Sequence, residues 1–427
     1  MRRSNIKVGL DIGSSNIRVI VASAEENGWR VLGSAKVPCQ GLRKGVVVDI
    51  EETTRAIVKA AETASGISGV PIEQAMVNID GAHLAVKVAK SMVAVSRANG
   101  EISQEDVDRV LANAESTVSP ENSPNREILH VIPRFFSIDN QSEIRDPVGM
   151  NGSRLDADTL IVTGATPFIK NLSKCINQAG ISISGLVASP LAAAESTLNR
   201  RQKELGVALV DIGVGTTGLS VFEEDQLIYA SVLPIGAGHI TNDIAIGLKT
   251  SIEVAEKVKI EYGSASPQDV SAKKEINLSK ISKNEEGTIK AKEIAEIVEA
   301  RMEEIFGLVN KELRRIKREG LLPAGIVLVG GGAKLPFVAD LARKVFQLNA
   351  QIGFVVKLGG ISETLEDPSY ATAVGLILWE NDENRERGGI SGIMGGNATA
   401  KVAYDKLLNF SGDFGKKAID WLKTFLP

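Results

Sequence analysis

An acidic-glycine turn that occurs twice constrains the fold of this chain more than any other feature. The first copy lies in Val8 to Ser15 (VGLDIGSS) and the second in Val210 to Gly218 (VDIGVGTTG). Each copy follows an apolar run that is typical of a β-strand, and two further runs of this kind follow it. One such turn is common in ordinary hairpins. Two copies in matching strand contexts predict a duplicated protein with two lobes.

The residue types in both turns predict phosphate binding. Glycine lets a backbone approach an anion closely, and backbone N–H groups curled in a turn bind phosphate. Hydroxyl side chains are expected to add donors at the same place in the two turns. The candidate phosphate ligands are Gly13, Ser14 and Ser15 in the first turn, with Gly213, Gly215, Thr216 and Thr217 in the second.

An aspartate stands at the start of each turn, Asp11 in the first and Asp211 in the second. A carboxylate repels phosphate unless a cation lies between them, and Mg²⁺ is a hard cation that prefers oxygen ligands. The pair therefore predicts a Mg²⁺ site. Asp11 and Asp211 are its candidate ligands, on opposite walls of a shared crevice.

The composition narrows the function. The 427 residues suffice for about two lobes with subdomains, and 43% hydrophobic with 24% charged residues are typical of a soluble globular protein. A formal net charge of -4 provides no general basic field, so no nucleic-acid partner is expected. Two distant cysteines, Cys39 and Cys175, indicate a reducing compartment and no metal site. No apolar run is long enough to predict a transmembrane helix.

Apolar periodicity along the chain predicts mixed sheets with flanking helices. The segment from about residue 83 to 163 has a different character, with strand-like runs and a helix that Ser103 and Asp106 are expected to cap. We interpret it as an inserted subdomain. The polar stretch 264–288 is interpreted as part of a second insertion, and an amphipathic helix is predicted over 293–318.

Two further motifs belong to the predicted site. Ser189 to Ser196 (SPLAAAES) is predicted to be a helix of small residues that leads to the second turn. Such a helix serves as a hinge between lobes or simply packs densely, and both interpretations remain open. Gly330, Gly331 and Gly332 end a buried strand, and three glycines would let the chain approach a flat ring or a ribose.

The C-terminal part of the sequence predicts a membrane-binding tail. A glycine-rich linker precedes an amphipathic helix over residues 413–427, which at roughly 1.5 Å per residue is too short to cross a bilayer. An apolar face opposite lysines is typical of a helix lying in the bilayer surface, and the flexible spacer argues against the alternative of docking on the chain's own core. The membrane candidates are Phe414, Trp421, Leu422, Phe425 and Leu426, with Lys416, Lys417 and Lys423 opposite.

These motifs together resemble the actin-like ATPase superfamily, whose members share two phosphate turns, a connecting helix and a glycine-rich adenosine turn. Here the matching residues are Asp11 to Ser15, Ser189 to Ser196, Asp211 to Thr217, and Gly330 to Ala333. The whole chain is most similar to the FtsA family of bacterial cell-division proteins. That similarity is carried by the insert with Asp146 to Met150, by Val210 to Gly218, by Gly236 to Asp243 and by the C-terminal helix.

The resemblance implies an α/β, actin-like (ribonuclease-H-like) duplicated two-lobe fold with an inserted subdomain in each lobe and a C-terminal amphipathic helix. The first lobe core would comprise residues 1–83 and 163–196, and its insert, for self-association, residues 84–162. The second lobe core would comprise 197–245 and 306–383, and its insert 246–305. A flexible linker (384–412) and the helix (413–427) would follow.

The resemblance also implies the function: ATP and Mg²⁺ bind between the lobes, the protein self-associates into filaments, and it tethers FtsZ to the membrane with other division proteins. Its place would be the cytoplasmic face of the cell membrane at the division septum, through anionic lipid. The C-terminal peptide of FtsZ would dock on the second insert near Arg301. Glu256 and Lys259 match the residues that hold adenosine, although they are equally a surface charge pair on one helix.

One departure from the superfamily concerns hydrolysis. In the heat-shock chaperones and MreB, a glutamate before the proline of the connecting helix positions the attacking water, and here Ser189 occupies that place. A hydroxyl orients water less firmly than a carboxylate, so tight nucleotide binding with at most slow ATP hydrolysis is expected. A pilus-assembly adaptor of the same fold and a small-molecule kinase of the superfamily are the alternatives.

Overall fold

The computed structural model describes residues 6–26, 28–118, 124–283, 285, 287–360 and 363–379. The predicted linker (384–412), the predicted helix (413–427) and its membrane candidates therefore lie outside the described residues. The described chain divides into two compact units, one formed by the residues up to 86 together with 164–379, and the other by 87–163. No helix of the described residues is both long and apolar enough to span a bilayer.

Two sheets of the first unit have the same strand order. The first runs β11-β6-β1-β2-β3, and the second, written in the matching direction, runs β18-β17-β12-β13-β14. In each, a central strand pairs with a parallel strand on one side and with an antiparallel hairpin partner on the other. This match confirms the predicted duplication of the lobes. The first sheet comprises β1 (Ile6–Ile12), β2 (Asn16–Glu25), β3 (Gly28–Pro38), β6 (Gln74–Ile79), β11 (Ser182–Ala188) and the added edge strand β19 (Gly359–Gly360). The second comprises β12 (Val207–Ile212), β13 (Thr217–Glu223), β14 (Gln226–Leu233), β17 (Gly325–Val329) and β18 (Ala350–Ile352).

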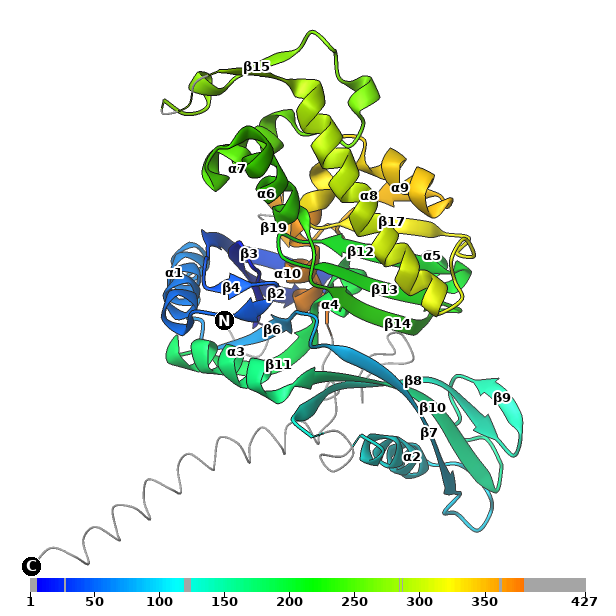
Figure 1. The fold of residues 1–427 in the computed structure, drawn as a ribbon. Helices are drawn as coiled ribbons and strands as arrows, with labels where there is room; N and C mark the ends of the chain where they lie inside the picture. Colours follow the sequence, from blue (N-terminus) through cyan, green and yellow to red (C-terminus); the bar gives the residue numbers. More distant parts are fainter. Residues whose placement is uncertain are drawn as a thin grey trace, which may run out of the picture. The chain divides into compact units, whose positions relative to one another are not determined.

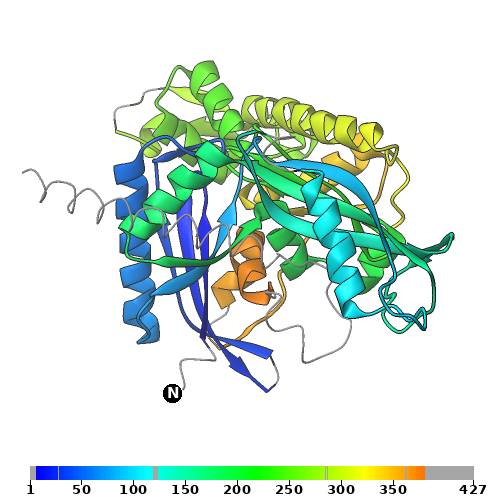
Figure 2. The same cartoon turned by 90° about the horizontal axis from the view of Figure 1, so that it is seen from below.

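Helices cover both faces of each sheet in this unit (Figures 1 and 2). On the first sheet, α1 (Ile50–Ser68) and α3 (Thr166–Gln178) lie on one face, and α10 (Ala371–Leu378) packs on the other. Asp49 caps α1 through the backbone N–H of Glu52, and Gly69 ends it in the left-handed conformation. A short hairpin of β4 (Leu42–Arg43) and β5 (Val46–Val47) precedes α1.

The second lobe has one continuous apolar core that extends into its insert. The helices of this lobe and its insert are α5 (Arg200–Leu205), α6 (Ala237–Leu248), α7 (Ile252–Tyr262), α8 (Ala291–Arg315) and α9 (Val338–Phe346), and α7 packs on α6 and α8. The predicted apolar stripe of α8 is present: Ile294, Val298 and Met302 are fully buried. The expected limit of the insert, residue 305, falls inside α8. The remaining elements there are β15 (Glu275–Asn277), β16 (Thr288–Lys290), η2 (Pro267–Asp269) and η3 (Leu278–Lys280).

Residues 87–163 form a separate small α/β unit. Its sheet has the order β7-β10-β8-β9, with α2 (Gln104–Ser116) packed on it. The predicted capping box is confirmed, because Ser103 accepts from the Asp106 backbone N–H and Asp106 accepts from the Ser103 backbone N–H. The strands are β7 (Ala85–Ala94), β8 (Arg126–Ile138), β9 (Gln141–Ile144) and β10 (Arg154–Ala165).

Two helices, α4 (Ser189–Thr197) and α10, lie between the two sheets of the first unit (Figure 1). They approach so closely that a Cβ on Gly375 of α10 would lie 1.8 Å from the carbonyl oxygen of Ala192 in α4. On its other side α10 packs on β1, where a Cβ on Gly9 would lie 3.0 Å from the Ala373 carbonyl oxygen. Glycine and alanine thus set the spacing of this central layer.

Replacing Gly375 by alanine is expected to lower the free energy of unfolding by about 3 kcal/mol or more, because a backbone carbonyl cannot move aside as a side chain can. Gly307→Ala in α8 is the matched control, since a Cβ there meets no atom within 4 Å. It should raise stability by about 0.5–1 kcal/mol. Urea unfolding of both variants measures the difference; equal stabilities would contradict the tight helix contact.

Candidate functional site

The two predicted turns have the same geometry. In each, the backbone N–H of the glycine donates to a carbonyl three residues on, Gly13 to Asn16 at 3.1 Å and Gly213 to Thr216 at 2.9 Å. In the hairpins, Asp11 lies opposite Arg18 and Asp211 lies opposite Gly218. The two aspartates therefore occupy equivalent places in the two sheets.

The predicted hydroxyl donors do not occupy equivalent places, which corrects one expectation. With the glycines aligned, Ser14 and Ser15 match Val214 and Gly215, and Asn16 matches Thr216. Thr217 is the first residue of β13, and its fully buried hydroxyl donates to the Ile235 carbonyl at 2.8 Å. The hydroxyl residues of the second turn lie two positions later than those of the first. The equal spacing of aspartate and glycine in the two turns gave no sign of this difference.

A cavity of about 420 Å³ brings most of the candidate residues together. Both turns, the start of α4 and the loop after β17 contribute to its wall. Two candidates do not line it: Thr217, and Gly215, where a Cβ would lie 3.0 Å from the backbone of Lys44. Those that do are Asp11, Gly13, Ser14, Ser15, Ser189, Asp211, Gly213, Thr216, Glu256, Lys259, Gly330, Gly331 and Gly332.

Three aspartates line this cavity, and the third, Asp80, was not predicted from the sequence. Asp80 follows β6 directly, and its Oδ2 accepts from the Thr216 hydroxyl at 2.6 Å. Burial raises the pKa of Asp11 and Asp80, and burial together with these two neighbours raises the pKa of Asp211 to about 7. The signal that could have identified Asp80 is its position at the carboxyl end of β6, which runs parallel to β1.

Cations near these carboxylates neutralise them only in part. Arg18 forms an ion pair with Asp11 at 3.2 Å and lies over the Tyr370 ring, while its buried Nε has no hydrogen-bond partner among the described residues. Asp211 accepts a hydrogen bond from the Thr372 hydroxyl at 3.2 Å. Lys36 also lines the cavity, and burial followed by repulsion from Arg18 lowers its pKa.

A hard cation fits this set of donors, because uncompensated carboxylate oxygens on opposite turns are ligands that Mg²⁺ accepts. Within the described ranges, no group of three or more His, Cys, Asp or Glu side chains has a spacing that could hold a metal by itself. Asp11 and Asp211 could therefore supply only part of a coordination shell. Phosphate oxygens and water would have to complete it.

At the other end of the cavity, Lys259 and Glu256 form a hydrogen-bonded ion pair. The Lys259 ammonium donates to Glu256 Oε2 at 2.6 Å and to the Thr241 hydroxyl at 2.8 Å. Lys259 is buried, with 6% of its surface exposed, whereas Glu256 is partly exposed in the cavity wall. The pair is thus both an internal charge pair and part of the cavity wall, which keeps both interpretations from the sequence open.

Packing requires glycine at two of the three glycine positions after β17, but not at the third. A Cβ on Gly330 would lie 2.3 Å from Asp211 Oδ1, and one on Gly332 would lie 2.3 Å from the Ile212 side chain. Both are therefore required by packing against the second turn. At Gly331, which begins η4 (Gly331–Lys334), a Cβ would meet nothing within 4 Å. Only this glycine leaves open space beside the cavity.

Two more predicted residues have their hydrogen bonds satisfied by protein groups. The Ser189 hydroxyl donates to the Ile79 carbonyl and accepts from the Asn78 amide, both at 3.1 Å. Arg301 lies on α8, away from the cavity, and its guanidinium makes two bonds to Asp243 at 2.6 and 2.8 Å. A quarter of the Arg301 side chain remains exposed.

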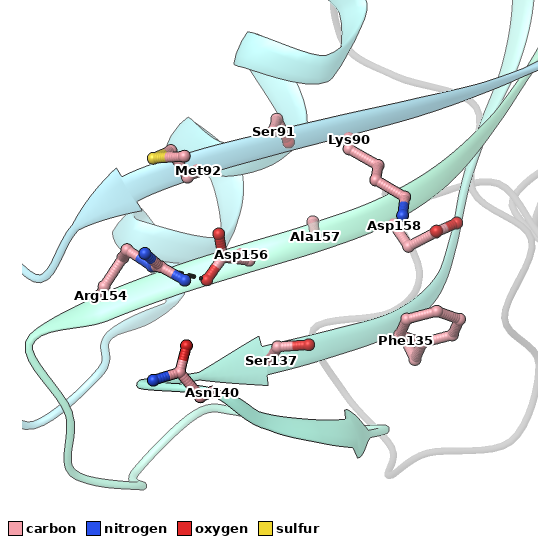
Figure 3. A pocket seen from close by; sticks show the side chains of 10 residues that line it. All are labelled: Lys90, Ser91, Met92, Phe135, Ser137, Asn140, Arg154, Asp156, Ala157 and Asp158. Atoms are coloured by element: carbon pink, nitrogen blue, oxygen red, sulfur yellow. Dashed lines mark hydrogen bonds and ion pairs between the residues drawn. The ribbon is translucent and has the colours of Figure 1, made fainter.

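A second hollow, of about 470 Å³, lies in the separate unit (Figure 3). Side chains of β7, β8 and β10 line one open face of the sheet, among them Met92, Phe135 and Asp158. Arg154 and Asp156 form an ion pair at 2.8 Å on the same strand. The residues lining this hollow include no histidine, cysteine or nucleophile-base pair, so it resembles a contact surface more than a catalytic site.

Comparison with solved structures identifies the class of fold. The chain superposes on a structure titled "PilM-PilN type IV pilus biogenesis complex" with a TM-score of 0.62 and 17% identity, covering 87% of this chain and 97% of that one. It also matches MreB5 of Spiroplasma citri bound to ADP with a TM-score of 0.50 and 14% identity, over 90% and 99% of the two chains. The fold is therefore the actin-like ATPase fold, as the sequence predicted.

Relatives identify the family within that fold. The family model "Cell division protein FtsA" matches residues 208–375, and "SHS2 domain inserted in FTSA" matches 81–163. The chain is 39% identical to cell division protein FtsA of Bacillus subtilis, over 88% of this chain and 84% of that protein. It is 31% identical to the FtsA of Escherichia coli, over 88% of this chain and 90% of that protein. The chain belongs to the FtsA family and is an actin-like cell-division protein.

The buried carboxylates predict a pH-dependent effect of Asp211→Asn on the nucleotide-free protein in EDTA. A raised pKa favours the protonated carboxyl, so its contribution to stability is present at low pH and lost as the pH rises through about 7. Asparagine resembles the protonated group. The variant should match the native chain only below the unfolded pKa of 3.8, and should exceed its unfolding free energy by on the order of 1–2 kcal/mol at about pH 5 and about 4 kcal/mol at about pH 8.

Thermal unfolding at both pH values measures this effect. Asp269→Asn, which changes an exposed aspartate of the second insert, is the control and should shift neither value. A destabilised Asp211→Asn at the higher pH would show that the cavity holds Asp211 as a favourable charge and that its pKa is not raised.

Proposed function

We propose that this chain binds ATP with Mg²⁺ in the cavity between its two turns and, as a filament, tethers FtsZ to the membrane during division. The observation that carries the nucleotide part is the pair of matching turns. Each places a glycine and an aspartate in the wall of one cavity, and burial with repulsion from Asp80 and Asp11 raises the pKa of Asp211. A magnesium nucleotide supplies both the anion and the cation that such a cavity lacks.

The roles of the residues follow from the two ends of the cavity. The turns, with Ser14, Ser15 and Thr216, would hold the phosphates, while Asp11 and Asp211 would hold Mg²⁺ directly or through water. At the other end, the open backbone at Gly331 would lie against the adenosine. Lys259 and Glu256 would bond the ribose or the base in the exposed part of their network.

Self-association and FtsZ binding are proposed for the two inserts. Residues 84–162 would contact a neighbouring protomer, and residues 246–305 would bind the C-terminal peptide of FtsZ. The support for the second site is Arg301, which already binds a carboxylate in two-point geometry and is partly exposed. A peptide carboxylate could exchange with Asp243 in the same geometry. We propose that other division proteins attach to the same filament.

Membrane attachment is proposed for the C-terminal residues 413–427, through anionic lipid. With that attachment, the protein would lie at the cytoplasmic face of the cell membrane at the septum, as a peripheral protein. The support is the sequence pattern of Trp421, Leu422 and Phe425 opposite Lys416 and Lys423. The linker 384–412 would give the filament its distance from the bilayer.

Family membership weighs against the two alternatives from the sequence. The pilus protein is similar in fold, but its 17% identity is far below the 31–39% of the two FtsA relatives. A small-molecule kinase would not belong to a cell-division family. Neither alternative accounts for the SHS2 insert that the family model recognises in residues 81–163.

Nucleotide binding is tested by thermal unfolding with ligand. MgATP at a hundred times its Kd should stabilise the protein by about 2.7 kcal/mol, and ATP in EDTA should stabilise it much less because the carboxylates then face phosphate unshielded. Asp211→Asn should lose most of the Mg²⁺-dependent part, and Asp269→Asn should keep it. Equal stabilisation with EDTA and Mg²⁺, or none with either, would refute the proposed site. GTP in parallel gives the base preference.

Membrane binding is tested by sedimentation with vesicles that contain phosphatidylglycerol. Removing residues 413–427 should leave the protein in the supernatant, and Leu422→Asp in the full chain should do nearly the same, because it places a charge in the apolar face. The matched control Asp420→Asn, on the polar face of the predicted helix, should still sediment. Sedimentation of the truncated protein would show that another surface binds lipid.

A further inference from the structure

The carboxylate of Asp80 has no role in the function proposed so far, although it faces the same cavity as both turns. Asp80 lies between Ile79, the last residue of β6, and Gly81, in the connection that leads to β7. Its Oδ2 accepts from the Thr216 hydroxyl at 2.6 Å, so a group of the first lobe contacts the second turn. A carboxylate in contact with a phosphate turn is unfavourable for ground-state binding alone, and this points to a different task.

Asp80 lies beside the second turn, in contact with Thr216. Glu256, Lys259 and Gly331 define the nucleoside end. At the opposite end the two turns meet, since a Cβ on Gly215 would lie 3.0 Å from the Ser14 hydroxyl. A Cβ on Gly45, in the loop between β4 and β5, would lie 3.0 Å from Asp80 Oδ2. Phosphates extending from the nucleoside end would therefore bring the terminal one next to Asp80.

The residue expected to position water, Ser189, is poorly suited to that work. Its hydroxyl proton is donated to the Ile79 carbonyl, and it also accepts from Asn78. The Ser189 hydroxyl is bonded to the carbonyl of Ile79, and Asp80 is the next residue in the chain. A carboxylate therefore lies one residue away from the acceptor of the Ser189 proton. The Asp80 carboxylate accepts from the Thr216 hydroxyl and from the Gly81 backbone N–H, and its two oxygens together retain acceptor capacity for a water molecule.

We propose that Asp80 is the group that orients the water attacking the terminal phosphate of ATP and accepts its proton, an inference that rests on the proposed nucleotide site. In this step the water oxygen bonds to the γ-phosphorus, and the bond from that phosphorus to the bridging oxygen breaks. ADP retains the electron pair, and the proton passes to Asp80. The products are ADP and inorganic phosphate. Burial raises the pKa of Asp80, which makes its carboxylate a stronger base than an exposed one.

The test uses the full chain with anionic vesicles and follows phosphate release from MgATP in a single turnover, alongside MgATP binding by calorimetry. Asp80→Asn keeps the size of the side chain and an acceptor for Thr216, so the variant should fold. Its hydrolysis rate should fall by about 100-fold or more, with MgATP affinity changed by less than about threefold. Asp269→Asn should match the native chain in both measurements.

A second variant separates proton transfer from a merely structural role. Asp80→Ala removes the carboxylate, and added formate or azide should restore hydrolysis several-fold, because a small anion can occupy the space and accept the proton. A group that only holds Thr216 in place would give no such rescue. Hydrolysis by Asp80→Asn within about threefold of the native rate, or no phosphate release from the native chain, overturns the inference. If the native chain does not bind MgATP in the calorimeter, the proposed nucleotide site itself is wrong.

Discussion

The structure depends on one electrostatic constraint: three aspartates face a single cavity, and among the described residues only Asp11 of the three forms an ion pair. Asp11 is paired with Arg18, whereas Asp211 contacts only a threonine hydroxyl among the hydrogen bonds of the described residues. Burying carboxylates in this way is unfavourable unless they are protonated or a cation is supplied. The stability of the cleft is therefore linked to what binds there, and a magnesium nucleotide satisfies the missing charge.

Duplication produces this arrangement from ordinary sheet geometry. In each lobe the aspartate stands near the end of a central strand, where a hairpin on one side meets a parallel strand on the other. Two such edges facing each other bring their carboxylates to one cavity. The layer of α4 and α10 fixes the separation of the sheets, because Gly375 and Ala192 leave no room for adjustment. The separation of the two sheets thus determines both how closely α4 and α10 pack and how far apart the carboxylates of the two turns lie.

The sequence was sufficient for the fold because its strongest signals are repeated or periodic. The two turns, the α2 capping box and the stripe of α8 were all predicted from residue patterns and are present. Individual contacts were harder to predict. Thr217 and Gly215 share the pattern of the turn but face protein groups, because strand register decides where each side chain points. Asp80 stands outside any motif, and only the parallel pairing of β6 with β1 brings it to the cavity.

The return of the last described helix to the first sheet has a consequence for synthesis of the chain. α10 packs on β1, β2 and β6, and the Lys7 ammonium donates to the Trp379 carbonyl. On the ribosome, one apolar face of the amino-terminal sheet therefore lacks its cover until nearly the whole chain has emerged. Contacts of such long sequence separation form slowly, and exposed strands are prone to aggregate in the meantime. The nascent protein should thus depend on chaperones until α10 closes the first lobe.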